Sequence, residues 1–381
     1  MGGRGSQKLE PIIHKRIRAS ATIHWGINML SRLARLRALS LSLLFVACDA
    51  NTPPLSTAEN LTPAFEFTEV AAGVFMAVPT EVIPTFSNAV VIENQEDVVV
   101  VDSHMIPEAA TALMNELREI TDKPVRFLIN THFHIDHTGG NQAFAPNVEI
   151  LGHEFTHEVV EAGGSREGRG YELVFGPIPD RLESLRSQLD TVSEEGRRAE
   201  LERRITYQEK FLEGVNSVVP TPPTRTFSDR FTLHQGDREI QLLFLGKGHT
   251  GGDVVVYLPE ERVVITGDLI FRDGPAYMGA AYFTEWVETL ERLKELEFGW
   301  VIPGHGPPFQ DREAIERFQS YLRDYWARAQ VLFEEGASAE AAAALMDMRD
   351  YSEHYPSMSG MGVRPDGMAR AFELLEGEAG T

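Results

Sequence analysis

Three histidines and one aspartate fall within six consecutive positions of the segment NTHFHIDHTGGN, which covers residues 130–141. The chain has 12 histidines in 381 residues. A chance occurrence of this His-x-His-x-acid-His pattern is therefore roughly a two-in-a-thousand event. Neutral imidazole and carboxylate are the ligands that borderline divalent metals such as zinc prefer. The segment predicts a metal site, so the fold must hold these side chains close together.

The cluster directly follows a predicted buried strand, because the apolar run VRFLIN precedes it. Side chains two residues apart face the same side of an extended chain, so His132 and His134 can bind one ion together. Asp136 and His137 come where the chain must turn, since Thr-Gly-Gly follows them and relaxes the backbone. Adjacent side chains point apart, which favours a second ion for this pair.

Three further ligand-type residues follow apolar runs later in the chain. His249 comes after IQLLFLG, Asp268 ends VVITGD, and His305 follows WVIPG. Two ions that lie about 3.5 to 4 Å apart need more ligands, including a shared one. Because each of the three residues ends a predicted strand, we expect them to converge with the first cluster at one edge of the sheets.

Short runs rich in valine and isoleucine alternate with helical segments in two series, one over residues 65–151 and one from about residue 226. This arrangement predicts an α/β fold in which two stacked mixed sheets are flanked by helices. A charged helical insertion, about 154–219, separates the two series and breaks near Glu195. It is a solvated decoration, a lid or a dimer interface. From residue 311 onward we expect two or three more helices.

Residues 29–48, MLSRLARLRALSLSLLFVAC, have the order of an export signal: an arginine-rich segment, a short apolar stretch, a small residue and the only cysteine. The apolar stretch is too short to cross a bilayer as a permanent helix. Cys48 resembles the lipid-attachment site of a bacterial lipoprotein, and a plain signal peptide cleaved nearby is the alternative. We predict a leader over 1–47, with Met29 as the true start, and a polar tether over 48–63.

The signal predicts an exported protein of the periplasm or cell envelope, which meets the membrane only through an N-terminal lipid anchor. Removal of the leader takes away eight Lys/Arg and one Glu, so the formal net charge falls from −22 to −29. Such an acidic surface repels phosphate backbones and argues against nucleic acid as the main partner. We expect a small-molecule substrate, and a homodimer is possible.

The ordered motifs His-x-His-x-Asp-His, Gly-His-Thr, Gly-Asp and Pro-Gly-His-Gly resemble those of the metallo-β-lactamase superfamily of αβ/βα hydrolases. The resemblance implies a four-layer αβ/βα sandwich over residues 64–325, followed by a C-terminal helical extension over 326–381. Carried over by position, it implies one metal held by His132, His134 and His249, another held by Asp136, His137 and His305, Asp268 as the bridge, and Asp102 as a residue that orients a ligand.

The resemblance also implies a metal-dependent hydrolase with two divalent cations, zinc being expected and iron or manganese being alternatives. The two cations would share a bridging hydroxide, and Asp136 would help to place it. We expect cleavage of an ester, thioester, lactone or related bond. A β-lactamase proper is one alternative, although those enzymes carry Cys or Ser in place of Asp268. An oxidoreductase resembling the mononuclear iron persulfide dioxygenases is another, but the complete second set of ligands argues against it.

Walls of the substrate pocket are expected from the segment FRDGPAYMGAAYFTEW, residues 271–286, because it follows the predicted bridging aspartate. Tyr277, Met278 and Tyr282 are the candidates for substrate contact. An aromatic cluster of this kind also occurs in protein cores, which is the alternative for these three residues.

Overall fold

The structure is a computed structural model that describes residues 62–379. Cys48, the predicted leader and all but the last two residues of the predicted tether lie outside the described residues. Within residues 62–379, none of the helices combines the length and the apolar character needed to cross a membrane.

The first sheet contains seven strands in sequence order, so each strand pairs with the next one along the chain. The first four strands pair antiparallel, and the fourth to the seventh pair parallel. The strands are β1 (Phe65–Ala71), β2 (Val74–Pro79), β3 (Ala89–Glu93), β4 (Val98–Val101), β5 (Val125–Ile129), β6 (Glu149–His153) and β7 (Arg225–Phe227).

The second sheet contains five strands in the order β12-β11-β10-β9-β8. Its pairings are antiparallel except between β11 and β12, which run parallel. The strands are β8 (Arg230–Gln235), β9 (Arg238–Phe244), β10 (Val254–Leu258), β11 (Val263–Gly267) and β12 (Trp300–Pro303). Both sheets are therefore mixed, as predicted.

Four layers follow from the way the strands bury both of their faces. In β4, Val99 and Val101 enter the core between the two sheets, whereas Val98 and Val100 pack against the outer helices. The alternation explains why a strand of four valines is buried throughout. The outer helix α1 (Pro107–Glu116), followed by the 3₁₀ turn η1 (Leu117–Glu119), covers the first sheet. The predicted fold class is confirmed.

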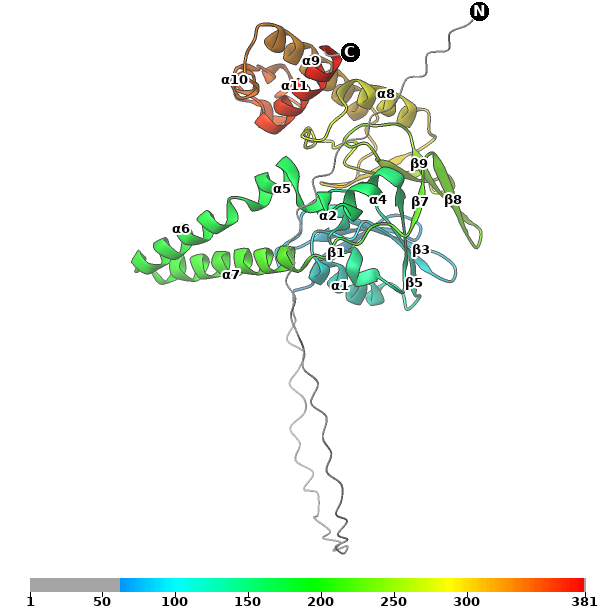
Figure 1. Ribbon diagram of the computed structural model, residues 1–381. Helices are drawn as coiled ribbons and strands as arrows, with labels where there is room; N and C mark the ends of the chain where they lie inside the picture. The colour runs from blue at the N-terminus through cyan, green and yellow to red at the C-terminus, as the bar shows by residue number, and fades with distance from the viewer. Residues whose placement is uncertain (1–61, 380–381) are drawn as a thin grey trace, which may run out of the picture. The chain divides into compact units, whose positions relative to one another are not determined.

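The insertion contains α4 (Glu154–Glu161), the 3₁₀ turn η2 (Gly164–Arg166), α5 (Gly168–Phe175), α6 (Ile178–Thr191) and α7 (Glu195–Ser217). Helices α6 and α7 lie side by side as a hairpin (Figure 1). The turn between them lies next to the predicted break near Glu195. Leu182 and Leu185 of α6 and Leu201 of α7 are buried. The predicted insertion and its hairpin are present in the structure, and its role as a lid or dimer interface stays a prediction.

The C-terminal helices cover the outer face of the second sheet. They are α8 (Phe283–Lys294), α9 (Glu313–Glu334), α10 (Ala339–Leu345) and α11 (Pro365–Ala379), with the 3₁₀ turns η3 (Arg349–Tyr351) and η4 (Pro356–Met358). The predicted boundary between residues 325 and 326 falls inside α9 and needs correction. Phe318, Leu322, Tyr325 and Ala329 form one buried stripe that continues across it, so the extension shares a core with the second sheet.

Candidate metal centre

The candidate ligands lie at the carboxyl ends of strands in both sheets. The first cluster follows β5 and Asp102 follows β4, which is its parallel neighbour. In the second sheet, Asp268 follows β11 and His305 comes shortly after the parallel neighbour β12. Carboxyl ends of parallel neighbours meet at one edge of a sheet. The fold therefore brings ligand-type side chains from two sheets to one place.

The first group consists of His132, His134, His249 and Asp268, whose offered ligand atoms all lie within 4.8 Å of one another. Nδ1 of His134 lies 3.0 Å from Nε2 of His132 and 2.9 Å from Nε2 of His249. Oδ2 of Asp268 lies 3.5 Å from Nε2 of His249 and 4.0 Å from Nε2 of His132. Three nitrogens and one carboxylate oxygen thus surround one point.

The second group consists of Asp136, His137 and His305, and its ligand atoms also lie within 4.8 Å of one another. Asp136 and His137 are carried by the short helix α2 (Ile135–Thr138), which is followed by α3 (Asn141–Phe144). Oδ2 of Asp136 lies 3.0 Å from Nε2 of His305 and 3.4 Å from Nε2 of His137. Asp136 and His137 therefore approach the same point because they lie on one helical turn. In extended chain, adjacent side chains would point apart.

Asp268 borders both groups. Its Oδ1 lies 3.3 Å from Nε2 of His137, and its Oδ2 lies 3.5 Å from Nε2 of His305. The same carboxylate is a member of the first group. Asp268 thus lies where the resemblance placed a bridging ligand.

The donor set fits divalent cations. Among the described residues, Nε2 of His137 and Oδ1 of Asp268 are buried without a hydrogen-bond partner. A buried polar atom without a partner is costly, and a bound cation would satisfy both of these atoms. The seven side chains could therefore hold metal ions, and imidazole with carboxylate suits zinc, iron or manganese.

Burial and mutual charges set the protonation of the two groups differently. Burial lowers the pKa of His134 to about 3 and that of His249 to about 4, so both imidazoles are neutral at physiological pH. Burial also opposes charge on His305, but the neighbouring Asp268 and Asp136 outweigh it and raise the pKa of His305 to about 10. The first group therefore presents imidazoles in the neutral form that binds metals.

Asp102 supports the centre from behind. Its Oδ2 accepts a hydrogen bond from Nδ1 of His137 at 2.7 Å and one from Oγ1 of Thr131 at 2.8 Å. The backbone N–H of Thr131 donates to Oδ1 at 2.8 Å. Asp102 has a φ of +63°, a left-handed conformation that aspartate and asparagine tolerate better than most residues. Its contact with His137 is the one expected of a ligand-orienting residue.

The loop that carries His305 is held by contacts that the sequence did not reveal. Nδ1 of His305 donates to the backbone carbonyl of Phe86 at 3.1 Å. Nδ2 of Asn88 donates to the carbonyls of Pro303 at 2.9 Å and Gly306 at 2.8 Å. Backbone acceptors leave no signal in a sequence, and an asparagine before a strand usually belongs to a turn. These partners were therefore missed.

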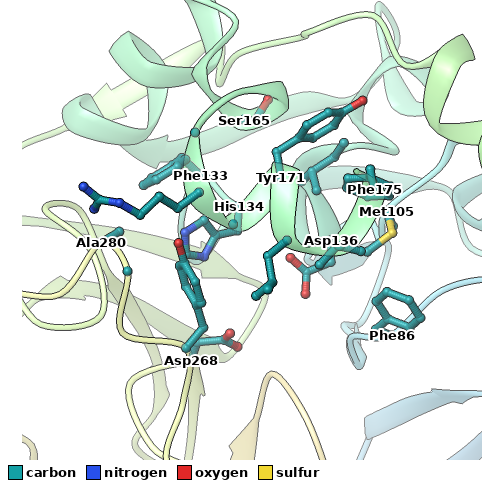
Figure 2. Close-up of a pocket in the computed structure, with 18 of the residues that line it drawn as sticks. Phe86, Met105, Phe133, His134, Asp136, Ser165, Tyr171, Phe175, Asp268 and Ala280 are labelled. Atoms are coloured by element: carbon teal, nitrogen blue, oxygen red, sulfur yellow. The ribbon is translucent and has the colours of Figure 1, made fainter. Parts of the chain in front are cut away.

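A cavity of about 710 Å³ lies over both groups (Figure 2). His134, Asp136, Asp268 and His305 line it, so the groups are open to a small molecule from this side. Helix α5 of the insertion and Arg364, which directly precedes α11, also line it, and the sequence did not place either segment at the site. Their position depends on tertiary packing, for which the local sequence gives no signal.

Of the three predicted substrate-contact residues, only Tyr277 lines the cavity. Its ring lies 5.5 Å from that of His134, edge to face, and burial raises the pKa of its hydroxyl to about 12. Met278 is buried in the C-terminal core instead, and the ring of Tyr282 is covered by Lys247 and Arg370. Neighbours in non-helical chain point to opposite sides, so Tyr277 and Met278 cannot both face the cavity. The predictions for Met278 and Tyr282 need this correction.

A family model described as the metallo-beta-lactamase superfamily matches residues 82–305. The linear primary-alkylsulfatase of Pseudomonas sp. is 26% identical over 244 residues, which are 61% of this chain and 44% of the alkylsulfatase. The 2,4-dinitroanisole O-demethylase subunit alpha of Nocardioides sp. is 28% identical over 219 residues, 56% of this chain and 51% of the subunit. The chain thus spans about half the length of these curated relatives.

A third relative, the metallo-beta-lactamase type 2 of Elizabethkingia meningoseptica, is 26% identical over 127 residues, 32% of this chain and 50% of the relative. Among solved structures, a metallo-beta-lactamase from Pontibacter korlensis has a TM-score of 0.49 at 19% identity and covers 68% of this chain and 99% of its own. The DIM-1 metallo-beta-lactamase has a TM-score of 0.49 at 18% identity, covering 68% and 98%.

Proposed function

Because the chain belongs to the metallo-β-lactamase superfamily, we propose that it is a metal-dependent hydrolase that cleaves an ester, thioester, lactone or related bond in a small molecule. The observation that carries the proposal is the position of Asp268 between two groups of ligand-type side chains, within 3.5 Å of His137, His249 and His305. This arrangement supports a dinuclear centre, and imidazole with carboxylate ligands favours zinc.

In the proposed centre, His132, His134 and His249 hold one ion, Asp136, His137 and His305 hold the other, and Asp268 is shared. Two bound divalent cations would acidify a water and polarise the bond to be cleaved. The side chain of Asp136 reaches the cavity and would orient the attacking water. Asp102 keeps the ring of His137 in place through its hydrogen bond to Nδ1.

The names of the relatives support a broad reaction class. One is an alkylsulfatase, one is an O-demethylase subunit for 2,4-dinitroanisole, and one is a β-lactamase. By their names, these three proteins act on three different kinds of bond, and each is similar to part of this chain. We infer that the cavity walls, more than the ligand set, select the bond that this chain cleaves.

We also propose that the protein is exported and lipid-anchored through Cys48. The support is the order of arginine-rich segment, short apolar stretch and cysteine over residues 29–48. Residues 49–63, DANTPPLSTAENLTP, are polar and rich in proline, as a tether between an anchor and a folded domain would be.

Chelation of the purified protein is expected to abolish hydrolysis, and added zinc is expected to restore it. The metal-loaded protein should carry two divalent ions per chain by elemental analysis. Removal of the ions should lower the thermal midpoint by on the order of 10 °C, because ligands that bind only the folded state stabilise it. The rates are measured on a panel of aryl ester, thioester, lactone, β-lactam and alkyl sulfate substrates.

Two outcomes of this experiment would count against the proposal. Full activity after both ions are removed would exclude a metal-dependent mechanism. One iron per chain, with oxygen consumed during turnover, would favour the oxidoreductase alternative.

The Asp102→Asn variant is expected to bind metal about 10- to 100-fold more weakly, the usual effect of removing a residue that orients a ligand. Asparagine suits the left-handed backbone at this position. It has only one side-chain oxygen, however, so it cannot accept both the hydrogen bond of the Thr131 N–H, which goes to Oδ1, and that of Nδ1 of His137, which goes to Oδ2. Competition with a fluorescent chelator measures the affinity.

Asp97→Asn is the matched control for this prediction. Asp97 is a buried aspartate at the opposite end of β4, where it accepts a hydrogen bond from Asn94. This variant should keep its metal affinity. If both variants lose metal to the same extent, the loss reflects general destabilisation rather than orientation of His137.

A further inference from the structure

The cavity has two chemically different sides. Beside the first group lies Tyr277, whose ring faces His134 and has the guanidinium of Arg364 5.5 Å from its centroid. Arg169 also lines this side. Each arginine already has a carboxylate partner, Arg364 in Asp366 and Arg169 in Glu373. This side of the cavity is therefore polar but nearly balanced in charge.

The other side, which we call the apolar arm, consists of Phe86, Met105, Tyr171 and Phe175, and Leu173 of the same helix α5 also lines the cavity. The ring centroids of Phe86 and Phe175 lie 5.3 and 5.4 Å from that of Phe211, a buried residue of the α6–α7 hairpin. The ring centroid of Tyr171 lies 4.5 Å from that of Phe175. Figure 2 shows Phe86, Met105 and Phe175 on the side of Asp136. The arm is thus a continuous apolar wall next to the second group.

The apolar arm is connected directly to the candidate metal centre. The carbonyl of Phe86 accepts the hydrogen bond from His305, and Ile135 and Asp136 line the cavity beside it. A molecule whose reacting bond lies over Asp268 would therefore extend along this wall.

Two large apolar side chains that line the cavity are also exposed to solvent. Phe86 has 44% of its surface exposed and Leu173 has 46%. Exposed apolar surface that is continuous with a pocket marks a binding site for an apolar ligand. In this protein the exposed side chains come from two segments far apart in the sequence, the β2–β3 loop and α5, and both line one cavity.

We propose that the substrate is an ester with a hydrocarbon chain, and that this chain lies in the apolar arm while the ester group lies over Asp268. The proposal rests on the proposed hydrolase function and names its substrate class. The apolar arm lowers KM for long chains, because every methylene removed from water adds to the binding free energy. Esters with short acyl chains cover less of this apolar wall, so we expect them to be poorer substrates.

The test uses the metal-loaded protein and the p-nitrophenyl esters of acetate, butyrate and octanoate, which share one leaving group. The value of kcat/KM is expected to rise at least about tenfold from acetate to octanoate. In the Leu173→Glu variant, the ratio of octanoate to acetate activity should fall by about tenfold or more. Because Leu173 is on the surface, a charged residue there is compatible with folding.

Val331→Glu is the matched control. Val331 is an apolar residue on α9 with 53% of its surface exposed, and it does not line the cavity. This variant should keep both the activity and the chain-length ratio of the unmodified protein. If the octanoate-to-acetate activity ratio fell equally in both variants, the proposal would be overturned. A charge outside the cavity would then have the same effect as a charge inside it.

Calorimetry separates the substrate class from the catalytic function. Octanoate is expected to bind the protein at least about tenfold more tightly than acetate, and Leu173→Glu should remove this difference. Equal rates and equal affinities for short and long chains would overturn the apolar-arm proposal and leave the hydrolase function intact. Chain-dependent binding without hydrolysis of any ester would support the arm and overturn the ester as the substrate, and the absence of hydrolysis across the whole substrate panel would overturn the hydrolase function.

Discussion

Replacing Asp268 with asparagine is expected to lower kcat/KM by on the order of 10³-fold, because metal catalysis contributes several kcal/mol and each 1.4 kcal/mol is a factor of ten. The two oxygens of Asp268 contact three histidines from both groups. An amide keeps the shape but supplies one neutral oxygen, so it cannot serve both ions. Bound metal should fall from two ions per chain to one or fewer, which elemental analysis and initial rates will measure.

Asp273→Asn provides the control for this variant. Asp273 lies in the loop that follows Asp268, is exposed, and pairs with Arg272 rather than with the centre. Its loss should leave metal content and rate within about twofold, as surface pairs contribute little. If the Asp268→Asn protein kept two ions and full activity, the shared-ligand assignment would be wrong.

A single added methyl group at Gly304 is expected to damage the centre almost as severely. A Cβ at this position would overlap Oδ1 of Asp268 and lie 2.9 Å from Cε1 of His137. Gly304 follows β12 and its N–H bonds the carbonyl of Gly267, so the backbone cannot move away without disturbing the sheet edge. We expect Gly304→Ala to lose on the order of 10²- to 10³-fold in kcat/KM, since small displacements of reacting groups cost about that much.

Gly299→Ala tests the same change at the opposite end of β12. The nearest heavy atom to a Cβ there is the carbonyl oxygen of Arg262, at 3.9 Å, which is ordinary van der Waals contact. This control should retain its metal and its rate. A Gly304→Ala protein with normal activity would mean that Asp268 and His137 can rearrange, and would weaken the geometric argument for the centre.

The convergence of the seven candidate ligand side chains could be predicted from the sequence because each of them lies in a motif with a local signal. His132, Asp268 and His305 follow apolar strands directly or within a few residues. The carboxyl ends of neighbouring parallel strands lie at the same edge of a sheet, so these side chains are expected to come together. The motif order then distinguished the set from isolated loop histidines. The two mixed sheets followed from the same apolar runs.

The cavity walls could not be predicted in this way. Helix α5 and Arg364 reach the site only through the packing of an insertion and a C-terminal segment, which depends on contacts distant in sequence. The choice between Tyr277 and Met278 depends on the direction of a non-helical loop, which composition does not determine. The boundary at residue 325 failed because the segment before it already belonged to the helix that continues after it.

The origin of the ligands in two separate sheets has a consequence for the folding of the chain. His132, His134, Asp136 and His137 follow the first sheet, whereas His249, Asp268 and His305 belong to the second. Bound cations would thus add a link between halves that are already joined at this edge by apolar packing and by hydrogen bonds, such as those from His305 to Phe86 and from Asn88 to Pro303. The affinity for cations and the free energy of association of the two sheets are therefore coupled. Neither half by itself supplies all the candidate ligands.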